Sequence, residues 1–205
     1  MIALIDYGSG NVRSVFNALL QHGADVKLTA DRREIASAER VVLPGVGAFG
    51  DCVRGLMARG LWGVMQEALG DGRPFLGICV GYQMLFEESE ESPGVRGFGF
   101  FRGKVRRFST PGLKVPQIGW NSLGLVRHPL WEGLPETPHV YFVHSYYPEP
   151  ADANTVIAWT TYGETFASAA GQGSVAGVQF HPEKSQAVGL RILKNFLVPR
   201  PQDGW

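Results

Sequence analysis

A cysteine between two glycines has the residue types needed for nucleophilic chemistry. Residues 77–81 read Gly-Ile-Cys-Val-Gly and lie between an apolar run and an amphipathic stretch. The pattern is the thiol counterpart of Gly-x-Ser-x-Gly, in which a sharp strand-to-helix turn exposes the nucleophile at the mouth of a pocket. A helix starting after Cys79 would direct backbone N–H groups at the same place. The alternative is a core thiol, because free cysteine is among the most buried residue types.

A second segment offers the base that such a thiol needs. Residues 179–183 have the sequence Gln-Phe-His-Pro-Glu and follow an apolar run. Pro182 disfavours helix at the preceding residue, so we expect an extended chain in which His181 and Glu183 project to the same side. Glu183 would then orient the imidazole and stabilise its charged form, as the third member of a catalytic triad does. The competing interpretation is a surface histidine beside a solvated glutamate.

A glycine loop is the third feature. Residues 44–47 have the sequence Pro-Gly-Val-Gly, directly after an apolar run. Glycine permits positive φ, so the N–H of Val46 or Gly47 could turn into a pocket. With the N–H of Val80 it would form a two-donor oxyanion hole. An ordinary turn explains this loop equally well by itself, and the functional hypothesis depends on all three features meeting at one sheet edge.

The elements that must position these residues follow from the hydrophobic pattern. Apolar runs alternate with helical periodicity in the first half, which predicts strands at residues 2–5, 26–28, 41–43 and 75–78. Continuous apolar strands separated by amphipathic helices predict a parallel sheet covered on both faces. Ligands bind beyond the carboxyl ends of such strands, where the three features fall. The helix after Cys79 is expected to run to about Phe86.

The second half has a different pattern. Residues 98–179 alternate by two and are punctuated by Pro and Gly, which predicts antiparallel strands added to the parallel core. The fold class is therefore α/β, with a mostly parallel central sheet flanked by helices and added antiparallel strands. We expect one domain over residues 1–198 and a flexible tail over residues 199–205. The acidic run at residues 87–92 is expected to be a solvated loop.

Composition excludes several classes of function. The 205 residues include 19 basic and 19 acidic side chains and have a net charge of +0, which argues against nucleic-acid binding. No apolar run approaches the roughly 18 residues needed to cross a membrane. Two cysteines and no basic leader predict reduced thiols in the cytoplasm, with Cys52 structural. His139 and His144 are five apart in a predicted strand and so on opposite faces, and neither a metal site nor a cofactor is expected.

At these residues the sequence resembles the class I glutamine amidotransferases, with Cys79, His181 and Glu183 at the positions of the family's triad. Within this class it is similar to the glutaminase subunits of imidazole glycerol phosphate synthases. The similar segments are residues 5–11, 115–121, 141–146 and 179–185. The motifs around the cysteine and histidine identify the class, and the other segments select the member.

The resemblance implies hydrolysis of glutamine to glutamate and ammonia without a cofactor. It implies a heterodimer with a (β/α)8-barrel cyclase, which uses the ammonia to make imidazole glycerol phosphate and an aminoimidazole carboxamide ribonucleotide in histidine biosynthesis. The glutamine-binding residues that it implies are Gly47, Gln83, His144, Ser145 and Tyr146. Those implied on the cyclase side are Asn11, Trp120 and Tyr141, for which core or strand packing is the alternative.

Three alternative functions are left open by the sequence. The chain could serve another synthase, in cofactor, purine or tryptophan synthesis. It could be a catalytically silent interaction subunit that kept the fold, although the complete set of triad residues argues against this. It could also hydrolyse γ-glutamyl compounds without a partner, in which case it would be active alone.

Overall fold

The first half of the chain contributes four strands to a parallel sheet, as its apolar runs predict, and a strand from near the end of the chain adds the fifth. The computed structural model describes residues 1–8, 11–109 and 111–198, so the tail predicted at residues 199–205 lies outside the described residues. Five neighbouring strands of the main sheet run parallel to one another. In spatial order they are β2 (Val26–Thr29), β1 (Ile2–Ile5), β3 (Arg40–Gly45), β4 (Phe75–Cys79) and β13 (Val175–Val178).

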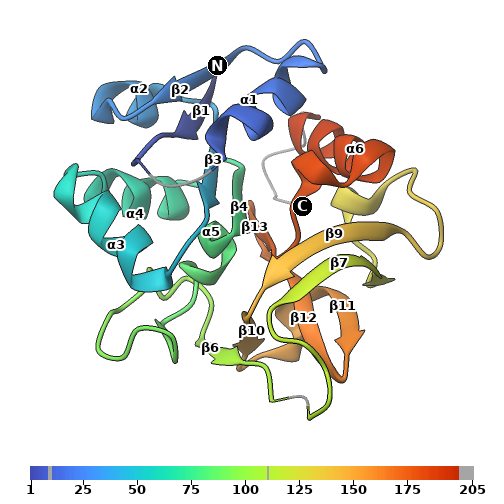
Figure 1. Ribbon diagram of the computed structural model, residues 1–205. Coiled ribbons are helices and arrows are strands. Elements are labelled where there is room, and N and C mark those ends of the chain that lie inside the picture. Colours follow the sequence, from blue (N-terminus) through green and yellow to red (C-terminus); the bar gives the residue numbers. More distant parts are fainter. Residues whose placement is uncertain (9–10, 110, 199–205) are drawn as a thin grey trace.

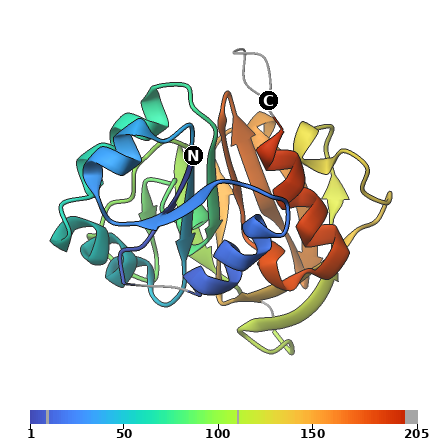
Figure 2. The same ribbon diagram turned by 90° about the horizontal axis from the view of Figure 1, so that it is seen from above.

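Helices cover both faces of this sheet (Figure 1 and Figure 2). On one side α1 (Val12–Leu20) packs against α6 (Gln186–Leu197). On the other side lie α2 (Arg32–Ser37), α3 (Phe49–Ala58) and α4 (Trp62–Gly70). The inner strands β1, β3, β4 and β13 are apolar and buried on both faces because helices cover both, whereas the edge strand β2 is partly exposed. No helix within the described ranges has the length and apolar character needed to cross a membrane.

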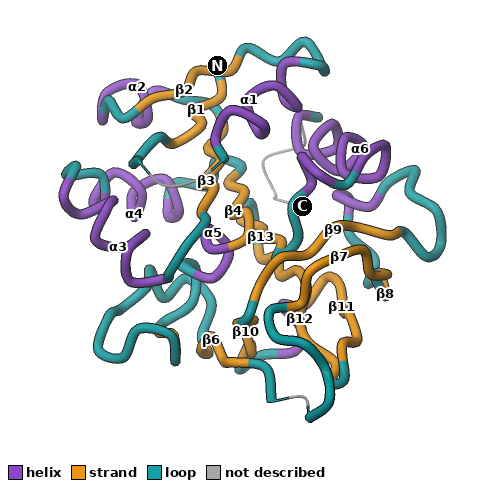
Figure 3. Tube along the Cα trace, viewed as in Figure 1, coloured by secondary structure: helices purple, strands orange, loops and turns teal. Residues whose placement is uncertain are grey.

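Antiparallel strands extend the sheet beyond β13 (Figure 3). They are β12 (Glu164–Gln172), β11 (Val156–Tyr162) and β8 (Gly124–Leu125). Two small sheets lie beside them and form the opposite side of the central pocket. One contains β10 (Tyr146–Pro150), β6 (Gly103–Arg107) and β5 (Glu88–Ser89), and the other pairs β7 (Gln117–Ser122) with β9 (His139–His144). The predicted fold class, a mostly parallel α/β sheet with added antiparallel strands, is confirmed.

The helix after the cysteine is shorter than the sequence pattern predicts. It spans only α5 (Val80–Gln83), and tighter turns continue the chain to Phe86. The backbone carbonyls of Met84, Leu85 and Phe86 accept N–H groups from residues 98–101 instead of from a following helical turn. Hydrogen bonds from the loop at residues 98–101 therefore end the helix. The spacing of apolar residues within the helix does not reveal these bonds.

Candidate active site

The predicted strand-to-helix turn is present at Cys79. The residue lies at the junction of β4 and α5 with φ 56° and ψ −112°, a conformation that residues other than glycine rarely adopt. The flanking glycines are required by close backbone approaches. A Cβ at Gly81 would lie 1.9 Å from the Leu43 carbonyl oxygen, and one at Gly77 would lie 2.8 Å from the Gly81 oxygen. The fold thus holds Cys79 in a strained conformation by allowing no side chain two residues before it, at Gly77, or two residues after it, at Gly81.

The glycine loop lies directly beside this turn. Gly45 is paired in register with Cys79, and a Cβ at Gly45 would lie 2.7 Å from the Gly81 nitrogen. Gly47 has φ +93°, the conformation that glycine was expected to supply. Val46 and Gly47 line the pocket next to the sulfur. The loop is therefore placed where an oxyanion hole for this cysteine would have to be.

His181 and Glu183 form a buried pair in the same pocket region. The His181 Nδ1 lies 2.8 Å from the Glu183 Oε1, and the two side chains are only 2% and 1% exposed. The alternative of a surface histidine beside a solvated glutamate is therefore wrong. The predicted geometry needs one correction: His181 is extended, but residues Pro182–Lys184 form a 3-10 helix that brings the carboxylate back to the ring.

The electrostatics of His181 reflect two opposing effects. Burial lowers the pKa of the imidazole, because the charged ring loses its water. Hydrogen bonding and charge attraction from Cys79 and Glu183 outweigh burial and raise that pKa to about 10. The Nε2 atom, on the side of the ring away from Glu183, is buried and makes no hydrogen bond of ordinary geometry within the described residues, so the Cys79 sulfur interacts with it only loosely. This nitrogen is therefore available for proton exchange with the thiol or a substrate.

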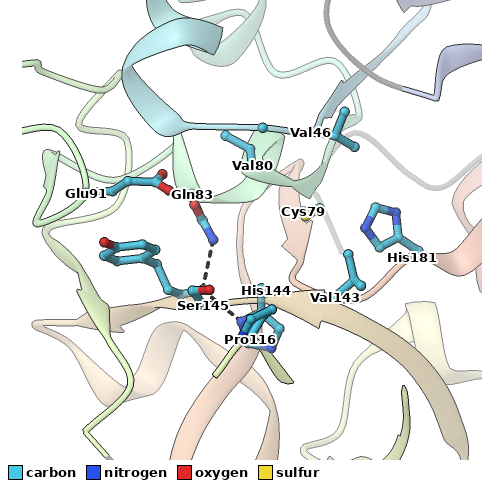
Figure 4. Close-up of a pocket in the computed structure, with 12 residues that line it drawn as sticks. Val46, Cys79, Val80, Gln83, Glu91, Pro116, Val143, His144, Ser145 and His181 are labelled. Atoms are coloured by element: carbon cyan, nitrogen blue, oxygen red, sulfur yellow. Dashed lines mark hydrogen bonds between the residues drawn. The ribbon is translucent and has the colours of Figure 1, made fainter. Parts of the chain in front are cut away.

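A cavity of about 230 Å³ unites the predicted site residues (Figure 4). Its volume is below the roughly 300 Å³ at which pockets for drug-sized ligands begin, which suits an amino acid. The predicted residues that line it are Val46, Gly47, Cys79, Val80, Gln83, His144, Ser145, Tyr146 and His181. Glu183 lies behind His181. Three further lining residues, Glu91, Pro116 and Val143, were not predicted as site residues.

The side of the pocket facing the cysteine turn is built from buried polar groups on β9 and β10. His144 Nδ1 lies 2.8 Å from the Tyr146 carbonyl oxygen, to which the Gln83 Nε2 also donates at 3.0 Å. Burial lowers the pKa of His144 to about 4, so this ring is neutral at physiological pH. His139 is exposed on the other face of β9, as predicted from its spacing to His144.

Glu91 corrects the prediction that residues 87–92 form a solvated loop. Its carboxylate accepts the Phe49 N–H at 2.7 Å at the start of α3, and the residue lines the pocket. Ser92 accepts the Gly50 N–H at 2.9 Å, and Ser89 is buried. The sequence carries no local signal for these contacts, because the partners are 42 residues apart.

The residues implied on the partner side lie outside the pocket. Trp120 on β7 is 48% exposed and makes an edge contact with Tyr141 on β9 at 6.0 Å between ring centroids. Ile118, two residues before Trp120, is 64% exposed. Asn11 is exposed at the start of α1. Within the described part of the chain, no group of three or more His, Cys, Asp or Glu side chains is arranged to hold a metal ion.

Comparisons with known proteins agree with this geometry. The family model described as "Glutamine amidotransferase class-I" matches residues 3–199. The chain is 49% identical over 203 residues to "Imidazole glycerol phosphate synthase subunit HisH" of Salinibacter ruber, covering 96% of this chain and 93% of that one. It is also 49% identical over 210 residues to the subunit of the same name from Dechloromonas aromatica, covering 98% and 97%.

Solved structures show the same fold at low identity. A crystal structure of a glutamine amidotransferase has a TM-score of 0.76 at 20% identity, covering 97% of this chain and 100% of that one. The structure of PurLQS from Thermotoga maritima has a TM-score of 0.75 at 20% identity, covering 96% of each chain. At this identity the likeness concerns the fold.

Proposed function

The chain belongs to the class I glutamine amidotransferase family, and from this premise we propose that Cys79, His181 and Glu183 hydrolyse glutamine to glutamate and ammonia. The observation that carries the proposal is the buried 2.8 Å contact between His181 and Glu183 beside the pocket that holds Cys79. The near full-length similarity to imidazole glycerol phosphate synthase subunits supports the same role in histidine biosynthesis.

Attack on the amide is the first step. The imidazole of His181, whose pKa is raised to about 10, is a strong enough base to take the proton of the Cys79 thiol as the sulfur attacks. The Cys79 thiolate forms a bond to the side-chain carbonyl carbon of glutamine. The N–H of Val80 and an N–H from the loop at Val46 or Gly47 stabilise the resulting oxyanion, each such donor contributing about 10²–10³ in rate.

Ammonia leaves in the second step. His181 gives its proton to the departing nitrogen as the C–N bond breaks, which leaves a γ-glutamyl thioester on Cys79. A water molecule then loses a proton to the neutral ring and attacks the thioester carbonyl, which releases glutamate and restores the thiolate. Glu183 keeps the ring oriented through both steps because it accepts the Nδ1 hydrogen.

The pocket also orients the substrate. Both N–H bonds of the Gln83 amide are used, on the Tyr146 carbonyl and on the Gln179 side-chain oxygen, each at 3.0 Å. Gln83 therefore offers only its oxygen to a ligand, and the Glu91 carboxylate lines the same cavity. Two acceptors suit the α-ammonium group of glutamine. We place that group between Gln83 and Glu91, with the side-chain amide reaching Cys79.

A partner would protect the product. Ammonia released into neutral water is mostly protonated and is then no longer a nucleophile, so a closed interface preserves it. We propose that a (β/α)8-barrel cyclase binds over Trp120, Tyr141 and Asn11 to form a heterodimer. Cyclase substrate would favour the loop orientation that completes the oxyanion hole. Isolated subunit that hydrolyses glutamine as fast as the assembled enzyme would contradict this coupling.

The proposal is tested by Cys79→Ala assembled with the cyclase. Glutamine-dependent synthesis should fall by a factor on the order of 10⁶, because the nucleophile is absent. Synthesis from added ammonium salt should persist, because the cyclase is unchanged. Loss of both reactions would instead assign Cys79 a structural role. Assays with other synthases separate this function from a glutaminase that serves another pathway.

A further inference from the structure

A buried glutamine outside the proposed triad lies against the Cys79 sulfur. Gln179 follows β13 and is fully buried, with its Nε2 3.8 Å from the Cys79 Sγ. Its Oε1 accepts an N–H from Gln83 at 3.0 Å. We propose that Gln179 is a further catalytic residue, whose amide N–H donates to the Cys79 sulfur and stabilises the thiolate. This inference rests on the proposed function of Cys79.

The hydrogen-bond network fixes which end of the Gln179 amide faces the sulfur. The Tyr146 carbonyl can only accept, so the Gln83 Nε2, at 3.0 Å, must be the donor to it. The second hydrogen on the same nitrogen needs an acceptor, and the Gln179 oxygen supplies one at 3.0 Å. The Gln179 NH₂ group therefore points the other way, to Cys79. A reversed amide would set donor against donor at Gln83 and an oxygen against the thiolate.

His144 holds the far end of this network. Its neutral ring carries one N–H, and the Nδ1 atom lies 2.8 Å from the Tyr146 carbonyl oxygen. That carbonyl thus accepts two hydrogen bonds, from His144 and from Gln83. Because all of these groups are buried, rotation of one amide would leave several polar groups unpaired. The donor to the sulfur is fixed in place before substrate binds.

An N–H donor changes the balance between thiol and thiolate. A thiolate accepts a hydrogen bond more strongly than a thiol does, so the donor favours the charged form. His181 also interacts with this sulfur, and the other charged or titratable groups around the pocket are Glu183 behind His181, His144, and Glu91. Tyr7 and Tyr82 pack nearby, with hydroxyls donated to backbone carbonyls of Pro44 and Ala167. Gln179 differs from these uncharged donors because its N–H is directed at the Cys79 sulfur.

The test compares Gln179→Glu, Gln179→Met and, as a matched control, Gln172→Glu at the exposed end of β12. Glutamate keeps the shape of glutamine but replaces the donor by an acceptor, and methionine removes the donor at similar length. The rate of Cys79 alkylation by iodoacetamide is followed by peptide mass spectrometry across the pH range in which cysteine thiols ionise. Thermal unfolding of each variant shows whether it is folded.

We expect the pH midpoint of Cys79 alkylation to move upward in both Gln179 variants, with a rate at neutral pH about tenfold lower, the equivalent of a hydrogen bond to a charged group. The Gln172→Glu profile should match the parent protein. An unchanged midpoint in a folded Gln179 variant overturns the inference, and Gln179→Met decides if Gln179→Glu does not fold. Alkylation by iodoacetamide needs no glutamine turnover, so failure of the proposed function would show separately, as absent glutaminase activity with the midpoint shift intact.

Discussion

Two buried histidines lie on opposite sides of the pocket and are held in opposite charge states. His181, at the end of the parallel sheet, is 2% exposed and has a pKa of about 10. His144, on the antiparallel side, is 6% exposed and has a pKa of about 4. Burial lowers both values, so burial cannot explain the difference. The partners of the two rings do: the Cys79 sulfur and the Glu183 carboxylate for His181, and a backbone carbonyl for His144.

The contrast shows how one pocket separates chemistry from positioning. The parallel side supplies Cys79 and the protonated His181 from strand ends, the two groups to which the proposed chemistry is assigned. The antiparallel side supplies neutral donors and acceptors, which hold Gln83 and Gln179 in fixed orientations. A charged His144 would set a second positive ring beside His181, and their repulsion already lowers the pKa of His144.

Glu183→Gln should have the largest effect on the difference in pKa between His181 and His144. The neutral amide cannot stabilise the imidazolium, so the two histidines should become alike in charge. We expect kcat for glutamine hydrolysis to fall about 10⁴-fold with little change in KM, as when the orienting acid of a triad is neutralised. Exposed Glu67→Gln on α4 is the control. A fall of less than tenfold would show that Glu183 does not set the state of the ring.

Trp120→Ala probes the outer surface of the antiparallel side. Trp120 and Ile118 are exposed on β7, and an exposed aromatic on a partner surface is a frequent binding hot spot. We expect cyclase affinity to weaken by about 30-fold, the equivalent of 2 kcal/mol. Glutaminase chemistry within the saturated complex should be retained. Leu28→Ala, on the opposite edge strand β2, should leave affinity unchanged; equal losses from both substitutions would argue against this docking surface.

The two histidines also predict opposite limbs of a pH–stability profile. The pKa of His181 is raised from 6.5 to about 10, so its contribution is complete below pH 6.5 and is lost as pH rises through about 10. The pKa of His144 is lowered from 6.5 to about 4, so stability is lost as pH falls from 6.5 to about 4. Each limb should have a slope of up to about 1.4 kcal/mol per pH unit.

Urea unfolding at a series of pH values measures both limbs. His144→Gln should flatten the acid limb and leave the alkaline limb, and His181→Gln should do the reverse. The two substitutions serve as controls for each other, because each removes one titration from the same pocket. A parent profile that is flat across both ranges would show that the two rings do not differ in charge.

The sequence could predict the parts of the pocket that are built from local patterns. The turn at Cys79 and the loop at Gly45 are local patterns, and their glycines are required by contacts between neighbouring strands. The rest of the pocket depends on contacts between distant segments: Gln83 meets Tyr146 on the antiparallel side across 63 residues, and Glu91 meets Phe49 across 42. Neither contact has a local pattern. The 3-10 helix after His181 was missed because proline at its first position also fits an extended chain.

Substitution of Cys52 is expected to have the smallest effect on activity, and it tests how the glycine loop is held. Its buried Sγ lies 3.4 Å from the Val46 carbonyl oxygen and donates to it. The peptide is planar and trans, so this hydrogen bond also directs the Gly47 N–H away from Cys52. Cys52→Ala removes the bond, and we expect stability to fall by about 1 kcal/mol and kcat to change by a few fold.

Cys52→Ser is the matched variant, because a hydroxyl can still donate to the Val46 carbonyl. Its kcat should lie closer to the parent value than that of Cys52→Ala, while KM stays the same in both. Thiol labelling should modify Cys79 in the parent protein and spare Cys52, which is fully buried. If alanine and serine behave alike, the thiol contributes only volume, and the glycine loop at residues 44–47 is held by backbone packing around Gly45 and Gly81.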